Sequence, residues 1–159
     1  MQENAGCGKM KIRKAKKGDF KEYLKLKREE EKDLSKRVNK RISYPKDNVL
    51  KKEFNKALSS KKSIILVVEE NKELIGYLHG SYFRNPYNKG GYVEDIFVLK
   101  KFRRKGIANK LIRLFIRDLK KKKYDIIQLS ANVKNKDAIK LYKKLNFELY
   151  HYDFKKKIK

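Results

Sequence analysis

The chain has 159 residues, which fits a single domain with a sizeable core over residues 10–159, preceded by a flexible lead-in at residues 1–9. Its 45 Lys and Arg residues against 19 Asp and Glu give a net charge of +26, which would attract phosphates, nucleic acid or an anionic membrane unless the lysines are simply solvated helix faces. A single cysteine, Cys7, excludes an intramolecular disulfide, and no secretory leader or run of eighteen apolar residues is present, so we expect a cytoplasmic protein without a membrane span.

Two helices are predicted in the first third of the chain, after a short strand over residues 10–15. Asp19 is a suitable N-cap for the first helix, whose apolar positions continue toward Val38. A proline breaks this pattern, and a second helix is expected from about Asp47. The first helix carries the densest acidic run, residues 29–33, which is either an exposed helix face with lysine partners or a rim that attracts amines.

Three strands are predicted in the middle of the chain. Residues 64–69 and 73–83 are rich in β-branched and aromatic residues, and they flank the turn residues Asn71 and Lys72, so we expect a hairpin. A loop rich in asparagine and glycine follows. The residues from Tyr92 to Val98 then predict a third strand, at the centre of the sheet.

A basic loop and a helix follow this central strand. Apolar residues recur at spacings of three and four from Ile107 to Leu119, which predicts an amphipathic helix. Gly106 and Ala108 let a ligand approach the backbone closely, where the first N–H groups of the helix point outward at the positive end of its dipole. This arrangement favours an anion, most often a phosphate. A Walker loop and a dinucleotide-binding loop are excluded, because the Gly-Lys-Ser/Thr ending and three spaced glycines are both missing.

A further strand is predicted over residues 125–132, then a helix, then a last strand over residues 147–154. Arg103, Gly106 and Ala108 of the basic loop match the segment R/Q-x-x-G-x-G/A, and the predicted helix matches N-x-x-A-x-x-L-Y-x-x-x-G-F at Asn135, Ala138, Leu141, Tyr142 and Phe147. Together these segments resemble the two signatures of the GNAT superfamily, the acyl-CoA-dependent N-acyltransferases. Asn146 stands where the second signature has glycine, and asparagine tolerates the left-handed backbone that ends a helix there.

The resemblance implies the α/β GNAT fold, a mixed sheet of about six to seven strands flanked by about four helices. The order of elements read from periodicity, βααβββαβαβ, matches that fold. It also implies an enzyme that moves the acetyl group of acetyl-CoA to a primary amine by direct attack in a ternary complex. Backbone N–H groups would hold the pyrophosphate, and the central strand would pair with the pantetheine arm. The expected cofactor-binding residues are Ile96, Phe97, Val98, Arg103, Arg104, Lys105, Gly106, Ile107, Ala108, Asn109, Asn135 and Tyr142.

Tyr142 matches the usual general acid of the family, since a tyrosine with a pKa of about 10 keeps a proton to give to the departing thiolate. It could instead simply pack on the sheet. Asn135 is expected to contact the cofactor, to cap its helix, or both.

Glu94 and Asp95 are the candidates for the base, with Glu94 preferred. Adjacent strand residues face opposite sides of a sheet, so only one of them can serve a given site unless a bulge intervenes. Deprotonation by water alone also remains open. Some protein N-terminal acetyltransferases carry a glutamate five residues before the motif asparagine. Ser130 stands at that position here and cannot act as a comparable base.

The amine acceptor is either a small amine or polyamine, or an amine of a protein such as a ribosomal protein. The basic surface permits nucleic-acid or ribosome association, and the family suggests a homodimer through the last strands. A different reading is a non-catalytic basic nucleic-acid-binding module on the same shell. No metal is expected, because His79 and His151 have no partners at ligand spacing.

Overall fold

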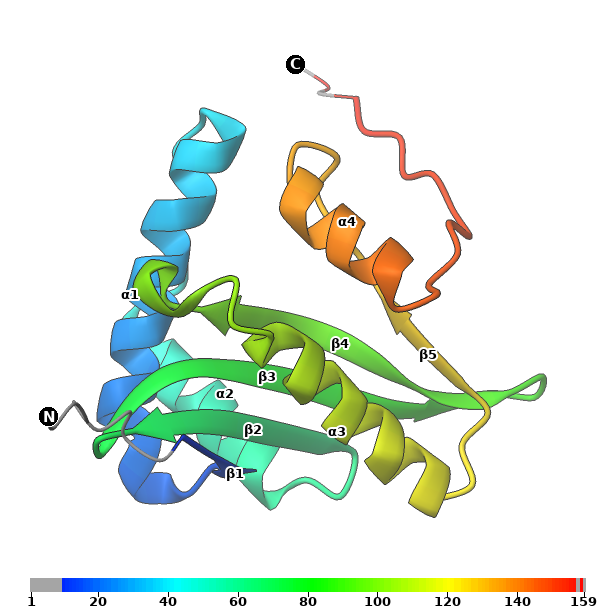
Figure 1. Ribbon diagram of the computed structural model, residues 1–159, viewed down its shortest axis with the longest axis horizontal. Coiled ribbons are helices and arrows are strands. Elements are labelled where there is room, and N and C mark those ends of the chain that lie inside the picture. Colours follow the sequence, from blue (N-terminus) through cyan, green and yellow to red (C-terminus); the bar gives the residue numbers. More distant parts are fainter. Residues whose placement is uncertain (1–9, 157, 159) are drawn as a thin grey trace, which may run out of the picture.

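A computed structural model describes residues 10–156 and 158 of the chain, so Cys7 and the predicted lead-in at residues 1–9 lie outside the described residues. Strands and helices follow one another in the predicted order as far as the last helix (Figure 1). Their bounds are β1 Lys11–Lys14, α1 Phe20–Val38, α2 Asp47–Ser59, β2 Ser63–Glu70, β3 Glu73–Arg84, β4 Lys89–Val98, α3 Ile107–Lys121, β5 Ile126–Leu129 and α4 Lys136–Lys144, with short 3-10 turns at Lys17–Asp19 and Lys100–Phe102.

The strands form one mixed sheet in the order β1-β2-β3-β4-β5. Strands β1 to β4 pair antiparallel, whereas β5 runs parallel to β4. The hairpin between β2 and β3 turns at Asn71 and Lys72, which both adopt positive φ angles, 51° and 66°. The predicted α/β class and the predicted hairpin are therefore confirmed.

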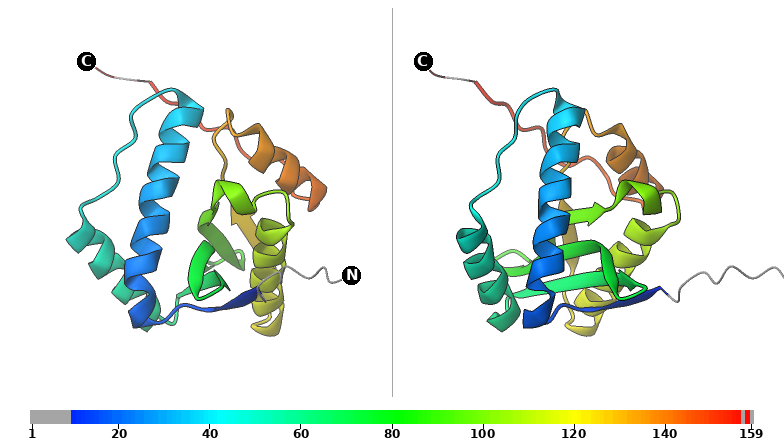
Figure 2. Two further views of the ribbon diagram at one scale, coloured as in Figure 1. Left: turned by 60° about the vertical axis from the view of Figure 1, so that its left-hand side comes forward. Right: turned by 90° about the vertical axis from the view of Figure 1, so that its left-hand side faces the viewer.

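The sheet separates two hydrophobic cores (Figures 1 and 2). Helices α1 and α2 cover one face, where Tyr23 and Phe54 pack against Tyr77 and Phe97 of the sheet. Helix α3 covers the other face, with Phe115 completely buried. Helix α4 lies beyond α3, beside β5, at the same end of the sheet as the C-terminal half of α1. No helix in the described part of the chain is long and apolar enough to cross a membrane.

The predicted last strand over residues 147–154 is wrong, so the sheet has five strands within the described residues, not six to seven. This segment is rich in aromatic residues, which favour strands, but no neighbouring strand pairs with it. Leu149, Tyr150, Tyr152 and Phe154 consequently remain exposed. Residue type alone does not make a strand, because a strand forms only where another backbone supplies the ladder of hydrogen bonds.

The helix ends follow the predicted chemistry with one difference. Asn146 has a φ of 63° just after α4, the left-handed conformation that asparagine tolerates at a helix end. Asp19 stands at the N-cap of α1, but its carboxylate accepts a hydrogen bond from the Lys16 N–H (2.7 Å) and pairs with Arg13 (2.7 Å). Asp19 therefore ties the start of α1 to β1 and does not cap the first turn through its side chain.

Candidate active site

Strand β4 contains a bulge at Glu94, and it lies between β3 and β5, so β3 and not β4 occupies the predicted central place in the sheet. Asp95 pairs with His79 and Val93 pairs with Gly80, so Glu94 is an additional residue in the ladder. A bulge changes the alternation of side chains across a strand. It therefore decides how the two candidate bases are oriented.

Both carboxylates point to the face of the sheet that α1 and α2 cover. Asp95 reaches Lys27 of α1 (Nζ to Oδ2, 3.0 Å), and the Ser81 hydroxyl donates a short hydrogen bond to Glu94. Ser81 lies four residues after Tyr77 on β3 and so shares its face, which packs against α1 and α2. Glu94 and Asp95 thus lie on the same side of the sheet. This is the arrangement expected for two adjacent strand residues when a bulge intervenes.

Lys27 is the centre of a buried polar network, although only 6% of the residue is exposed. Its ammonium contacts Glu30 (3.0 Å), Asp95 (3.0 Å) and the Tyr77 hydroxyl (3.1 Å), and that hydroxyl donates to Glu30 (2.6 Å). Burial favours the neutral form of Lys27, but the two carboxylates outweigh it, and the net effect raises the pKa of Lys27. Asp95 is therefore bound to a permanent cation, whereas Glu94 is exposed and bound to a neutral hydroxyl.

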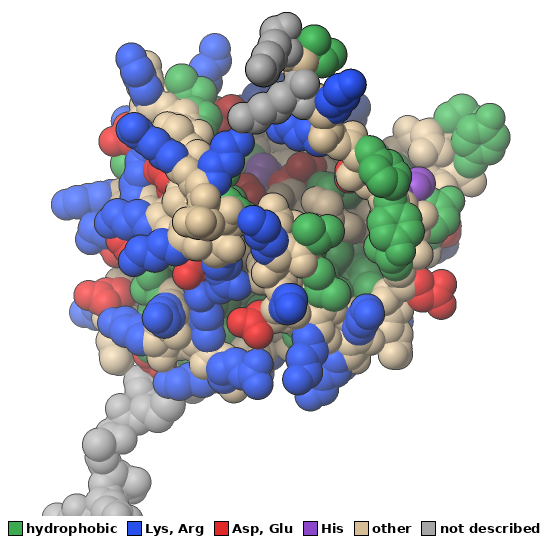
Figure 3. Space-filling model, turned by 90° about the horizontal axis from the view of Figure 1, so that it is seen from above, with side chains coloured by type: hydrophobic (Ala, Val, Ile, Leu, Met, Phe, Trp, Pro, Cys, Tyr) green, Lys and Arg blue, Asp and Glu red, His purple; other side chains and the backbone are tan. Residues whose placement is uncertain are grey.

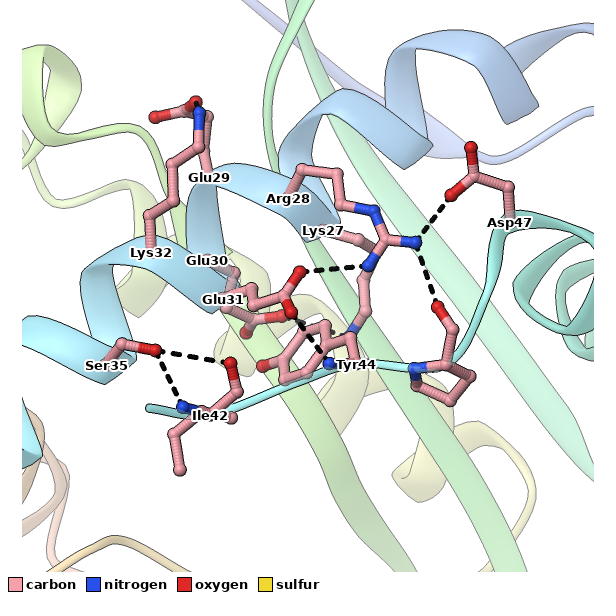
Figure 4. A network of polar contacts seen from close by, with 11 residues as sticks. Lys27, Arg28, Glu29, Glu30, Glu31, Lys32, Ser35, Ile42, Tyr44 and Asp47 are labelled. Atoms are coloured by element: carbon pink, nitrogen blue, oxygen red, sulfur yellow. Dashed lines mark hydrogen bonds and ion pairs between the residues drawn. The ribbon is translucent and has the colours of Figure 1, made fainter. Parts of the chain in front are cut away.

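A second set of contacts holds the segment between α1 and α2 against α1 (Figure 4). Arg28 bridges Glu31 (2.9 Å) and Asp47 (2.5 Å) and also donates to the Pro45 carbonyl (2.9 Å). Glu31 accepts in turn from the Tyr44 N–H (2.8 Å). These bonds fix Tyr44 and Pro45 above the face of the sheet that carries Asp95.

The acidic run at residues 29–33 forms no open rim, because each of its acidic side chains has a basic partner. Glu29 lies on the surface, while Glu30 and Asp33 are partly buried. In chain order the four acidic residues pair with Lys32, Lys27, Arg28 and Arg37.

A cavity of about 260 Å³ lies between the α1–α2 pair and the sheet. Seen from above, the molecule is hollowed at its centre, and acidic side chains and a histidine appear inside the hollow (Figure 3). His79 lines the cavity, and burial lowers the pKa of its imidazole, so the ring is neutral at physiological pH. The lining residues are Tyr23, Lys27, Tyr44, Pro45, Leu50, Glu53, Phe54, Ala57, Ile65, His79 and Asp95.

Strands β4 and β5 separate beyond a short paired region. Their last pair is Val93 with Leu129, so residues 95–98 pair with β3 on one edge and have no strand partner on the other within the described residues. The backbone of Ile96, Phe97 and Val98 thus presents an open edge where a ligand with amide groups can add as a strand would.

The loop before α3 turns backbone N–H groups outward. Arg104 and Gly106 both adopt left-handed φ angles, 66° and 75°, and Gly106 is the N-cap of α3. Within the described residues, no hydrogen-bond acceptor is recorded for the N–H groups of residues 104–109, and those of Ile107 to Asn109 belong to the first helical turn. A Cβ added to Gly106 would meet no atom within 4 Å, so the loop is open in front. These donors, with the exposed Arg104 and Lys105 side chains, fit the pyrophosphate of a coenzyme A.

Arg103 points away from these N–H groups. Its guanidinium donates to the Val98 carbonyl (2.9 Å) and to Asp33 of α1 (3.0 and 3.1 Å). Asp33 also accepts from Arg37 (2.8 Å), which reaches Asn135 at the start of α4 (2.8 Å). The C-terminal half of α1 thereby joins two of the predicted cofactor-binding residues, Arg103 and Asn135.

Helix α4 carries Asn135 and Tyr142. Asn135 is the N-cap and accepts from the Ala138 N–H (3.3 Å), so its capping role is present in the structure, and its contact with a cofactor stays a prediction. Tyr142 is 8% exposed and packs in the same core cluster as Val98 and Ile107. Burial, with a smaller contribution from Tyr92, raises the pKa of Tyr142, so its hydroxyl keeps its proton at neutral pH.

The contacts of Lys27, Asp33 and Arg37 at this site were not predicted from the sequence. Asp33 was expected only as part of the acidic run at residues 29–33, and its spacing from Arg37 is that of a helical ion pair, a common surface feature that does not indicate a site. A buried lysine has no signature in sequence, because lysines on amphipathic helices are nearly always exposed.

Comparison with known proteins gives a single answer for the family. A model described as "Acetyltransferase (GNAT) family" matches residues 24–147. Among curated proteins, N-alpha-acetyltransferase MAK3 from Arabidopsis thaliana is 36% identical over 66 residues, which are 39% of this chain and 35% of that protein. The chain thus spans only about a third of the length of that curated relative.

Solved structures share the fold at low identity. The BH1408 protein of Bacillus halodurans superposes with a TM-score of 0.83 at 21% identity, over 93% of this chain and 99% of that one. The aminoglycoside N-acetyltransferase AAC(6')-Iy in complex with CoA superposes with a TM-score of 0.79 at 21% identity, over 97% of this chain and 98% of that one. An aminoglycoside acetyltransferase from an uncultured soil metagenomic sample superposes with a TM-score of 0.75 at 21% identity, over 94% of this chain and 97% of that one.

Proposed function

This chain belongs to the acetyltransferase (GNAT) family, and from that premise we propose that it moves an acetyl group from acetyl-CoA to a primary amine. The observation that carries the proposal is the combination of outward N–H groups at residues 104–109 with the open edge of β4 beside them. The N–H groups offer donors to phosphates, and the edge of β4 offers backbone hydrogen bonds to an arm that contains amide groups. Coenzyme A has phosphates and such an arm in one molecule.

The N–H groups of residues 104–109 would hold the pyrophosphate, and Ile96 to Val98 would align the pantetheine arm. Bound there, acetyl-CoA supplies an acetyl group activated as a thioester. Arg103 would act indirectly, since its bonds to Val98 and Asp33 fix the loop that carries the donors. Arg104 and Lys105 are exposed and can add charge beside the phosphates.

Glu94 would take the proton of the amine, directly or through water. Its carboxylate is exposed and bound only by the Ser81 hydroxyl, whereas Asp95 would have to give up its ion pair with Lys27. Asp95 therefore serves better as a fixed negative charge near the reacting amine. The Tyr142 hydroxyl keeps its proton at neutral pH and would donate it to the departing sulfur.

The acceptor would enter the cavity of about 260 Å³ beside Asp95 and His79. Its aromatic walls, Tyr23 and Tyr44, suit an apolar or cationic group, and Asp95 and Glu53 offset the charge of an ammonium. This volume is below the range of about 300–1,000 Å³ that is typical of drug-sized ligands. A linear amine or a single residue of a protein chain fits such a space better than a molecule of several rings.

Calorimetry with coenzyme A tests the cofactor site first. The wild-type protein should bind coenzyme A at moderate salt, which suppresses attraction by net charge alone. Gly106→Glu should abolish binding, because it places a carboxylate and a strained backbone in front of the phosphate donors.

Gly18→Glu is the matched control, since Gly18 also has open space in front of its Cβ position and lies before α1, outside the proposed site. The control should bind coenzyme A as the wild type does. Equal loss in both variants, or no binding by the wild type, would contradict the proposal. Once binding is established, small amines, polyamines and peptides are screened for thiol release.

A further inference from the structure

Positive charge is distributed unevenly over the fold. Every ion pair recorded within the described residues includes a residue between Arg13 and Arg37, so the acidic partners are concentrated around α1. Residues 101–159 contain 20 Lys and Arg but only five Asp and Glu. Beyond Arg103, no ion pair is recorded in the described part of this segment. The cations beyond Arg103 therefore have no acidic partner within the residues that the structure describes.

Part of this charge forms a stripe along the exposed face of α3. Lys110, Arg113, Arg117 and Lys121 are all exposed and follow one another at spacings of three and four. At 1.5 Å per residue the stripe is about 16 Å long. The acidic residue of α3, Asp118, is engaged with the Tyr82 hydroxyl (2.5 Å).

An open groove of about 390 Å³ runs beside the stripe, between α3 and β1. Three of its five lining residues are the cations Lys110, Arg113 and Arg117, and the other two are Ile12 and Leu114. Among the described residues no carboxylate lines it, and apolar atoms form most of its floor. A groove bordered by a row of cations is complementary to a polymer with evenly spaced negative charges.

We propose that this α3 stripe and groove bind the phosphate backbone of structured RNA. The stripe is long enough to contact several successive phosphates of one strand, which lie a few ångströms apart. The apolar face of α3 is buried against the sheet, with Leu111, Ile112 and Phe115 unexposed, so the helix offers a ligand only its cationic face. Double-stranded RNA is recognised mainly by its shape and by contacts to its backbone. The exposed cationic face of a fixed helix can make such backbone contacts.

The surface is separate from the proposed catalytic cavity. The residues that line the cavity come from α1, α2, the segment between them and the sheet. Helices α1 and α2 lie on the opposite face of the sheet from α3 (Figure 2). RNA bound along α3 would therefore leave the acceptor cavity open. The protein could then acetylate a partner while it is held on an RNA-containing particle.

Fluorescence anisotropy with a labelled RNA hairpin of about 16 base pairs tests this proposal. The triple variant Lys110→Glu, Arg113→Glu, Arg117→Glu should raise Kd at least about tenfold and reduce the slope of log Kd against log salt by about 2 to 3. The triple variant Lys51→Glu, Lys52→Glu, Lys56→Glu changes the net charge by the same amount on exposed positions of α2, on the other face of the sheet. It should leave Kd within about twofold and the salt slope unchanged.

Equal weakening in both triple variants would mean attraction by net charge alone and would overturn the proposal, as would an absence of RNA binding by the wild type at 50 mM salt. A DNA duplex of the same length that binds as tightly as the RNA would overturn the choice of RNA. Arg113 also bonds Asn109 (2.7 Å), so the double variant Arg117→Glu, Lys121→Glu serves as a second test away from that contact. It should weaken RNA binding in the same direction.

Saturating coenzyme A separates this surface from the proposed cofactor site. RNA affinity should not change when coenzyme A is added. Displacement of RNA would assign its binding to the N–H groups of residues 104–109 and overturn the proposal. The RNA measurements do not depend on acetyl transfer, so they retain their meaning whether or not the chain proves to be an active enzyme.

Discussion

Lys27 Nζ lies 3.0 Å from Asp95 Oδ2, an ion pair that joins α1 to β4 across 68 residues of sequence. The lysine side chain is 7% exposed and the aspartate side chain 37%, and Glu30 shares the same ammonium. A buried cation between two carboxylates holds the helix, the strand and the cavity wall in one arrangement.

Removal of the Lys27 charge should destabilise the fold strongly. Lys27→Met leaves the carboxylates of Glu30 and Asp95 close together without the cation between them. Removing one partner of a buried ion pair costs about 3–5 kcal/mol. Urea unfolding measures the change. Lys32→Met, which breaks the exposed pair with Glu29 on the same helix, should cost less than about 1 kcal/mol. Similar losses in the two variants would show that Lys27 contributes no more than a surface charge.

Glu94→Gln should affect catalysis, whereas Asp95→Asn should affect mainly stability. With an accepted amine, Glu94→Gln should lower kcat/KM by about 10² to 10⁴ at neutral pH, as expected for loss of a general base. The remaining activity should rise with pH, because the amine must then lose its proton to water. Asp95→Asn should reduce kcat/KM less and lower the midpoint of unfolding. If Asp95→Asn instead lowered kcat/KM more than Glu94→Gln across the pH range, the base would be Asp95.

Tyr142→Phe should slow the reaction without weakening coenzyme A binding. The ring keeps its packing against Phe147, with centroids 5.9 Å apart, while the donated proton is lost. We expect kcat to fall by about 10² or more, with the Kd for coenzyme A within about twofold of wild type. Tyr92→Phe removes a hydroxyl that contacts Ser130 (3.0 Å) and is the control. Full activity in Tyr142→Phe would leave Tyr142 with a packing role only.

Arg103 and Asp33 should be coupled in stability. A double-mutant cycle with Arg103→Met and Asp33→Asn should give an interaction energy of about 1 kcal/mol, because each residue is about three-quarters buried and two hydrogen bonds join them. Coenzyme A binding, measured by calorimetry, should weaken to a similar extent in either single variant, since both loosen the same loop. A loss of binding confined to Arg103→Met would indicate that the guanidinium contacts the phosphates itself.

His79 should make the protein less stable in mild acid. Burial lowers the pKa of His79 below its usual 6.5, so below that pH the unfolded chain binds more protons than the folded one. The free energy of unfolding should therefore fall as the pH decreases from 6.5 through the lower pKa of the folded state. His79→Gln should flatten this part of the stability curve, whereas His151→Gln, on the exposed C-terminal segment, should not. An unchanged curve in His79→Gln would contradict the assignment.

The sequence by itself determined the elements and the exposed N–H groups of the loop before α3. Helices α1 to α4 and strands β1 to β5 were predictable because the periods of 3.6 and 2 are local properties of the chain. Gly106 and the first turn of α3 were predictable for the same reason, since a helix start exposes its own N–H groups wherever it lies. Asn146 could be assigned to a left-handed helix end from its residue type alone.

Only the tertiary structure decided which of these residues meet. The bulge at Glu94 depends on the register between β3 and β4, and Arg103 finds Asp33 across 70 residues of sequence. The aromatic residues at 147–154 were compatible with a strand, but pairing requires a neighbouring edge that local sequence does not specify. The burial of Lys27 likewise depends on the carboxylates of Glu30 and Asp95, which meet only when α1 packs on the sheet. Without them, removing the charged ammonium from water would be too costly.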